Sequence, residues 1–297
     1  MNKETIHDWL PQRVEVTAKV IDDYREKRLL SKLCLQLYQE TGSLCVLCAN
    51  ADIGGKESKW VFDRKQAICA GLLIRIAKFM LAVIRLSAGQ EHGEVIMALN
   101  RSITESAVNL RFLISKNDDE LFESFVRTSL STEREFYDLV MRHIDQRGET
   151  LVIEERILKS IGRVASLSGV DIQEVDPGFH RWAGGLRQLY EALGQPERYV
   201  TEERMGSHAV HGTWVDLVLN HLRPVNGGFA IDSDPTASDG KLRWPIGLIA
   251  LEAAQAYVME FFKDVSGSRI LYDRITDLME RTLAVGTARD DWSVAEG

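Results

Sequence analysis

The densest cluster of side chains suited to acid/base and phosphate chemistry lies between residues 204 and 211. Arg204, His208 and His211 fall within eight residues there. In a helix that turns by about 100° per residue, these positions (i, i+4 and i+7) share one face. Imidazole exchanges protons near neutral pH, and a guanidinium can hold a phosphate through two parallel hydrogen bonds. The spacing therefore permits one local site for acid/base work on a phosphate.

Such a set contains the groups that RNA cleavage through the 2′-hydroxyl requires. A base removes the hydroxyl proton, an acid protonates the leaving oxygen, and a cation stabilises the charge that develops on the phosphorane. Histidine can fill the first two roles and arginine the third, so this chemistry needs no metal ion and no cofactor. We take Arg204, His211 and His208 as candidate catalytic residues and RNA as the candidate partner.

The same residues also fit a structural role. Histidine and arginine on one face of an interior helix commonly hydrogen-bond to a buried carboxylate. Glu105 is the candidate partner, with Arg101 one turn before it, and Ser207 completes a supporting polar layer. Such a layer can fix helix register without chemistry, or receive a small ligand. Two hypotheses stay open: an enzyme, and a non-enzymatic helical sensor or interaction protein. Solvent access to His211 separates them.

Three other motifs lack the residues that their chemistry needs. Cys45 and Cys48 form a lone C-x-x-C pair without a second pair or a nearby histidine, which is typical of buried small side chains. The glycines and lysine at 54–56 lack the earlier glycine and the preceding strand of a phosphate loop. The acidic loop at 232–243 lacks the glycine and the glutamate of an EF-hand. The sequence therefore predicts neither a metal nor a cofactor.

Composition restricts the class of protein. The 45% apolar content supports a sizeable core, and a net charge of -8 argues against a surface coated with nucleic acid, so any RNA contact must be local. The first residues lack the layout of a secretory signal. The most apolar stretch, 68–86, carries Arg75, Lys78 and Arg85, which favours a buried amphipathic helix over a membrane span. We expect a cytoplasmic protein without a membrane contact.

The elements that must position these residues are helical, because apolar residues recur at three- and four-residue spacing along most of the chain. Short connections between long amphipathic helices indicate an antiparallel bundle. The predicted fold is all-α, a large multi-helix bundle with one loop or short hairpin insertion near residues 223–244. The expected helices span 12–44 (with a possible break near Gly42), 61–88, 93–115, 118–146, 150–167, 182–193, 246–263 and 268–284.

Three parts are expected along the chain. Residues 1–60 form an N-terminal long helix and loop, residues 61–286 form the main helical bundle domain, and residues 287–297 form a flexible tail.

Two segments resemble a known bacterial family. The helix from Asn100 to Leu113, with Arg101 and Glu105, resembles the R-x-x-x-E helix of the domain-of-unknown-function family 5677, and residues 207–212 resemble its S-x-x-V-H-G segment. The resemblance covers roughly residues 61–262. It implies an all-helical cytosolic protein and leaves the activity open.

The R-x6-H spacing of Arg204 and His211 also resembles the R-x(4-6)-H motif of the HEPN superfamily, helical bundles that include metal-independent ribonucleases. That resemblance implies an endoribonuclease, such as a toxin or phage-defence effector, whose site is completed by a second subunit of a homodimer. Two departures are visible. Met205 stands where active members carry a polar residue, and Gly206 weakens the helix that would present the pair.

Overall fold

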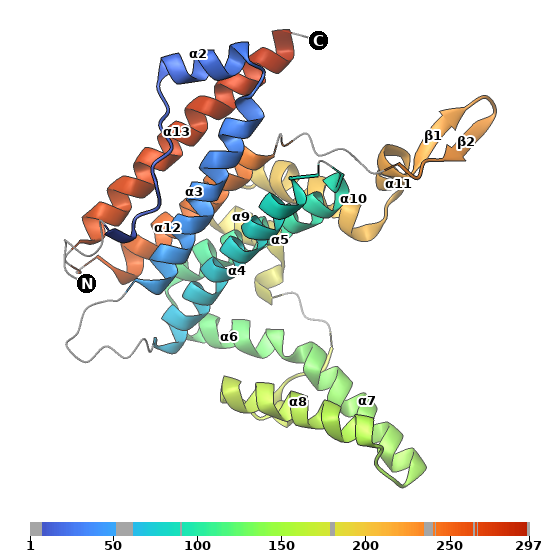
Figure 1. Cartoon of the computed structure of the whole chain (residues 1–297). Coiled ribbons are helices and arrows are strands. Elements are labelled where there is room, and N and C mark those ends of the chain that lie inside the picture. The colour runs from blue at the N-terminus through green and yellow to red at the C-terminus, as the bar shows by residue number, and fades with distance from the viewer. Residues whose placement is uncertain are drawn as a thin grey trace. The chain divides into compact units, whose positions relative to one another are not determined.

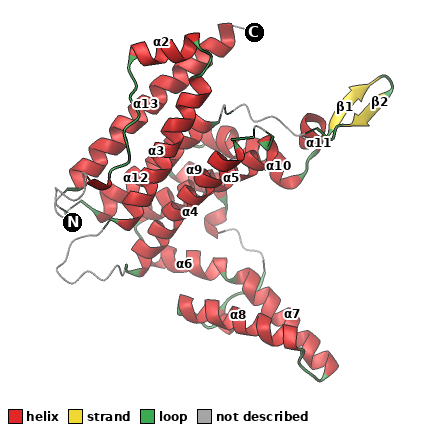
Figure 2. Cartoon of the chain, in the orientation of Figure 1, coloured by secondary structure: helices red, strands yellow, loops and turns green. Residues whose placement is uncertain are grey.

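The chain is predominantly helical in the computed structural model, which describes residues 8–51, 62–89, 91–178, 182–234, 240, 242–263, 265 and 267–295, without the side chains of 203–205 and 291–295. Within these residues the only sheet has two strands, so the predicted all-α class is confirmed (Figure 2). The α-helices are α2 (Ala18–Glu26), α3 (Leu30–Asn50), α4 (Arg64–Leu86), α5 (Gly93–Lys116), α6 (Asp119–Ser129), α7 (Ser131–Arg147), α8 (Val152–Ser168), α9 (Leu186–Ala192), α10 (Met205–His211), α11 (Trp214–Asn220), α12 (Arg243–Phe261) and α13 (Ser268–Ala295).

The chain divides into two compact units. The first comprises Met1–Ser115 and Tyr190–Gly297, and the second comprises Lys116–Leu189. Both boundaries predicted from the sequence, at residues 60 and 286, fall inside the first unit and stay predictions. The helix α13 continues to Ala295, so the tail predicted from residue 287 begins inside this helix.

The core of the first unit is built around α3, which packs on α4, α12 and α13 (Figure 1). Leu37 and Leu44 of α3, Leu73 of α4 and Leu278 of α13 are almost fully buried. Each such side chain contributes roughly 1.5–3 kcal/mol by leaving water. The helix α12 is apolar around most of its circumference, with Tyr257 fully buried, as expected of an enclosed helix.

The N-terminal helix begins later than its periodicity predicts, and the expected start at residue 12 is wrong. Residues 11–17 carry no helix, and α2 starts only after Thr17, whose hydroxyl accepts a hydrogen bond from the N–H of Val20. Arg28, with φ 57°, separates α2 from α3. Gly42 does not break α3, which continues to Asn50, and a Cβ built on this glycine would lie 3.7 Å from the Cβ of Met80 on α4.

Two further helix boundaries differ from the prediction. The helix expected over 118–146 is two helices, α6 and α7, that meet at the buried Leu130. The short helix expected from residue 182 begins at Leu186, because Ala183 (φ 47°) and Gly184 (φ 83°) interrupt it. Local turn geometry, not the apolar period, decides both boundaries.

The second unit has its own core. Leu130, Ile161, Ala165 and Val170 pack together, with the residues around the short 3-10 turn η1 (Ile172–Glu174). Arg134 of α7 donates hydrogen bonds to the carbonyls of Ile172, Gln173 and Val175, so this turn is fixed against α7.

The predicted hairpin is present. Strand β1 (Leu222–Val225) pairs antiparallel with β2 (Gly228–Ile231), with Arg223 opposite Ala230, and Gly227 at the turn has φ 89° (Figure 1). Two strands alone are only marginally stable in water. The ring contact between Trp214 of α11 and Phe229 of β2, with centroids 5.4 Å apart, packs the hairpin on the preceding helix.

The helix α4 is long and apolar enough to cross a membrane by length and composition. Core helices of globular proteins meet the same criterion. Here α4 packs on α3 and buries Cys69, Leu73, Ile76, Met80 and Val83 in the core of the first unit.

Candidate functional site

The segment that carries the candidate catalytic residues is not one straight α-helix. A π-helical turn, η3 (Tyr199–Arg204), leads into α10. A π turn rotates the chain by less per residue than an α-helix, so the rotation of about 100° per residue behind the predicted shared face does not apply to the turn that ends at residue 204. The side chain of Arg204 lies outside the described residues, and its place beside His211 stays a prediction.

Two of the predicted supporting residues meet. The guanidinium Nη1 of Arg101 on α5 donates a hydrogen bond to the Oγ of Ser207 on α10. Glu105 is half-buried on the same helix as Arg101. Within the described part of the chain, no hydrogen bond or ion pair joins it to His208 or to His211. The polar layer between α5 and α10 is therefore an Arg101–Ser207 contact without the carboxylate.

Gly206 permits this contact. A Cβ built on Gly206 would lie 2.9 Å from the Cβ of Arg101 and 3.4 Å from the carbonyl oxygen of Met97. Real Cβ atoms do not approach so closely, so any side chain at 206 forces α10 away from α5. The glycine that weakens the helix by propensity is thus the residue that allows the two helices to touch.

We therefore expect Gly206→Ala to destabilise the protein by ~1–3 kcal/mol, the usual cost of overpacking. Chemical denaturation measures the effect. Gly162→Ala is the matched control, because Gly162 is exposed in α8 with no atom within 4 Å of the added Cβ. That control should gain up to ~1 kcal/mol in helix propensity. Equal stability changes for the two variants would contradict the close packing of α10 on α5.

The two histidines of α10 differ in environment. His208 is half-buried, and its Nδ1 lies 2.8 Å from the Oγ1 of Thr213, the residue that precedes α11. His211 is exposed in the last turn of α10, where Gly212, with φ 55°, ends the helix. The solvent access that separates the two hypotheses is thus present at His211.

A network of charged side chains holds the π turn in place. Tyr190 donates a hydrogen bond of 2.8 Å to Glu202, which also pairs with Arg198. Arg198 in turn pairs with Glu252 of α12 at 3.0 Å, and Arg111 of α5 pairs with the same carboxylate at 2.8 Å. These contacts join the turn before α10 to α5 and α12. Arg198 and Glu202 are spaced i,i+4, but the contacts of Glu252 with Arg198 and Arg111 connect residues far apart in the chain, which local spacing does not reveal.

Sequence reasoning also missed a cluster at the base of the hairpin. Glu94 of α5, Asp216 of α11 and His221, which follows α11, bring three possible metal-ligand atoms within 4.8 Å of one another. Asp216 is buried, whereas the other two are half-exposed. Glu94 is distant in sequence, and only the fold brings it to the other two.

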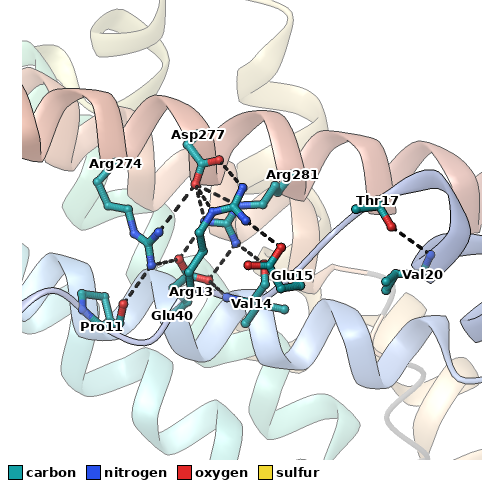
Figure 3. Close-up of polar contacts among 10 residues, drawn as sticks. All are labelled: Pro11, Arg13, Val14, Glu15, Thr17, Val20, Glu40, Arg274, Asp277 and Arg281. Carbon is teal, nitrogen blue, oxygen red and sulfur yellow. Dashed lines mark hydrogen bonds and ion pairs between the residues drawn. The ribbon is translucent and has the colours of Figure 1, made fainter.

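A second missed cluster surrounds Glu40 on α3 (Figure 3). This buried carboxylate accepts hydrogen bonds of 2.8 and 2.7 Å from Arg281, pairs with Arg274 at 2.9 Å, and accepts the backbone N–H of Val14 at 2.9 Å. Arg274 and Arg281 also donate to the carbonyls of Pro11 and Val14. The extended N-terminal segment is thereby fixed to α3 and α13.

Neighbouring charged groups shift the pKa values of Arg281 and Asp277 in this cluster. Burial alone would lower the pKa of Arg281, but hydrogen bonds to Glu40 and Asp277 outweigh it and raise that pKa. Burial alone would raise the pKa of Asp277, but hydrogen bonds from Arg13 and Arg281 outweigh it and lower that pKa. Both shifts favour the charged forms of Arg281 and Asp277.

The C-x-x-C pair lies in the core. Cys34, Cys45, Cys48 and Cys69 are all buried and free. Burial raises the pKa of Cys45 and of Cys69 to about 12. Since the thiolate is the reactive form, these thiols are inert in the folded chain.

We expect a thiol reagent such as 5,5′-dithiobis(2-nitrobenzoate) to modify none of the four cysteines in the native protein and all four after unfolding in guanidinium. The absorbance of the released thiolate counts them. Rapid reaction of one native thiol would show that α3 or α4 opens to solvent.

A cleft of about 500 Å³ in the second unit contains none of the predicted site residues. It is lined by Glu120, Glu123, Ser124, Arg127, Thr128, Ser131, Glu174, Val175 and Asp176. Of the rejected motifs, the loop at 54–56 and Asp239 lie outside the described residues, whereas Asp232 accepts the backbone N–H of Asp234 at 3.1 Å, an ordinary acidic turn.

The site segments fall inside a region shared with other proteins. Residues 66–229 match the model described as "Family of unknown function (DUF5677)", and this range is more than half of the 297 residues. It contains both segments on which the resemblance rests, the Arg101–Glu105 helix and residues 207–212. No curated protein and no solved structure matches the chain. The chain belongs to this family of unknown function, DUF5677.

Proposed function

We propose that the chain is a metal-independent endoribonuclease in which His211 and His208 of α10 exchange protons with RNA and Arg204 balances the phosphate charge. The exposure of His211 carries the proposal. A histidine that only fixed the register of interior helices would be enclosed, whereas a general base must reach its substrate. His208 lies one turn away on α10, so two imidazoles can act on one phosphate.

The chemistry balances with these groups alone. His211 takes the proton of the 2′-hydroxyl, the 2′ oxygen bonds to phosphorus, and the bond from phosphorus to the 5′ oxygen breaks. His208 gives a proton to that leaving oxygen, and since its Nδ1 contacts Thr213, Nε2 is the nitrogen that we assign to this step. The products are a 2′,3′-cyclic phosphate and a 5′-hydroxyl. Arg204 stabilises the dianionic phosphorane that forms before these products separate.

The biological setting is part of the proposal. We place the enzyme in the bacterial cytoplasm as a toxin or phage-defence effector, and we expect a homodimer in which a second α10 contributes to the same phosphate. The support is the R-x6-H spacing and its resemblance to the HEPN superfamily. Light scattering after gel filtration measures the oligomeric state.

Paired substrates test the activity. The purified full chain is incubated in EDTA with an RNA oligonucleotide and with the DNA of the same sequence. The proposal predicts that only the RNA is cleaved, because the nucleophile is its 2′-hydroxyl. Intact RNA across diverse sequences, under conditions where the chain is dimeric, would overturn the proposal.

A second candidate is a non-enzymatic interaction protein. It is favoured by the exposed apolar side chains between residues 210 and 231, since large exposed apolar patches mark partner surfaces. They are Val210, Trp214, Val215, Leu217, Leu219, Val225, Phe229 and Ile231. If RNA stays intact while the chain captures a partner through this surface, this reading replaces the first.

A further inference from the structure

We propose that Glu94, Asp216 and His221 bind a divalent transition-metal ion of the zinc type. Glu94 lies in the first turn of α5, Asp216 in the first turn of α11, and His221 directly after α11. The imidazole Nε2 of His221 lies 3.1 Å from the Oε2 of Glu94 and 3.7 Å from the Oδ2 of Asp216. Three donor atoms, two from helices and one from the residue after α11, thus lie within 4.8 Å of one another.

These separations fit a metal coordination shell. Zinc binds imidazole nitrogen and carboxylate oxygen at about 2.0–2.2 Å in tetrahedral geometry, which places neighbouring ligand atoms about 3.4 Å apart. The observed 3.1 and 3.7 Å lie on either side of that value. These two separations therefore need only small side-chain adjustments to hold an ion, and all three ligand atoms lie within 4.8 Å of one another.

The burial of Asp216 favours a cation beside its carboxylate. Only 7% of its side chain is exposed. Its Oδ1 accepts a hydrogen bond of 2.8 Å from Asn220, whereas among the described residues no donor hydrogen-bonds to its Oδ2, which faces the imidazole. A buried carboxylate without full compensation is costly, and a second carboxylate beside it adds repulsion. A divalent ion removes both penalties.

The surrounding contacts preorganise the ligands. Asn220 orients the carboxylate of Asp216, as outer partners of metal ligands do. The backbone N–H of His221 donates to the carbonyl of Leu217 at 2.9 Å, and its carbonyl accepts the N–H of Asp232 at 2.8 Å. The histidine is thus fixed at the base of the hairpin, and the ion would tie this base to α5.

The donor set selects the class of ion. One imidazole with two carboxylates suits zinc or manganese, whereas magnesium and calcium prefer oxygen ligands alone. The side chain of His221 is 43% exposed, which leaves room for water at the remaining coordination position. The competing arrangement is a protonated His221 between two carboxylates without metal.

Isothermal titration calorimetry distinguishes the metal-binding arrangement from the metal-free one. The full chain is purified in EDTA, freed of chelator and titrated with ZnCl₂, MnCl₂ and MgCl₂ separately. We expect one equivalent of Zn²⁺ or Mn²⁺ to bind more tightly than Mg²⁺. Asn220→Ala should weaken binding about tenfold, and His221→Ala and Glu94→Gln about 100-fold or more, the upper end of such effects. The exposed His143 of α7 supplies the control His143→Ala, which should bind as wild type does.

A second readout keeps the test independent of folding and of RNA. Zn²⁺ should raise the thermal midpoint of wild type and of His143→Ala but not that of His221→Ala. An ion stabilises the folded state only of a variant that still has the site. Absence of saturable binding, or unchanged binding in both His221→Ala and Glu94→Gln, would overturn the proposal. Neither readout uses cleavage, so the metal site and the proposed ribonuclease stand or fall separately.

Discussion

Replacing Glu40 with alanine is expected to lower the free energy of unfolding by about 3–5 kcal/mol, the usual cost of breaking a buried ion pair from one side. The side chain of Glu40 is 1% exposed, and it compensates Arg274 and Arg281, which are 11% and 5% exposed. Its removal leaves these two guanidinium groups with the partly exposed Asp277 as the carboxylate that still pairs with both. It also frees the backbone N–H of Val14.

A matched control uses the other end of the same cluster. Glu15 pairs with Arg13 at 2.9 Å, but its side chain is 71% exposed, and exposed pairs contribute little. Glu15→Ala should change stability by less than ~0.5 kcal/mol. Urea denaturation monitored by circular dichroism gives both values. If Glu40→Ala were no less stable than Glu15→Ala, the buried network would not hold the N-terminal segment in solution.

Replacing His211 with alanine is expected to slow RNA cleavage by ~10² to 10⁴, the usual worth of a positioned acid or base. The thermal midpoint should stay nearly constant, because His211 is exposed and no core contact is lost. Single-turnover cleavage rates measure the first effect and calorimetry the second.

His143→Ala is the control for this prediction, since it removes an exposed histidine from α7 in the second unit. It should keep the wild-type rate. If His211→Ala instead unfolded the chain, the histidine would be a structural residue and the interaction-protein reading would take over. Equal rates for the two variants would remove His211 from the mechanism.

The sequence predicts the helices well where their apolar residues face the core of the same unit. The hairpin also follows from local signals, because Asn226 and Gly227 mark its turn. The error at residues 11–17 has a tertiary cause. Their spacing permits a helix, but the carbonyls of Pro11 and Val14 accept hydrogen bonds from arginines of α13, which hold the segment extended. Local propensity carries no information about such partners.

The sequence predicts the candidate site only in part, because contacts between distant segments decide the rest. The predicted polar layer contains Arg101 and Ser207 together with Glu105, and the structure brings the first two into contact. The sequence does not connect Glu94 with Asp216 and His221, because helices α6 to α10 separate α5 from α11 along the chain and only the fold brings the three together. Helix propensity alone marks Gly206 as a weak position in the helix, whereas the approach of α10 to α5 explains why glycine stands there.

The ends of the cleaved RNA test the central claim most directly. The wild-type chain is incubated in EDTA with an RNA oligonucleotide that is labelled at one terminus, and the new termini are identified by mass spectrometry. If His211 and His208 catalyse transfer of the phosphoryl group to the 2′ oxygen, one fragment carries a 2′,3′-cyclic phosphate and the other a 5′-hydroxyl. Absence of cleavage, or fragments that carry a 5′-phosphate, would contradict the account.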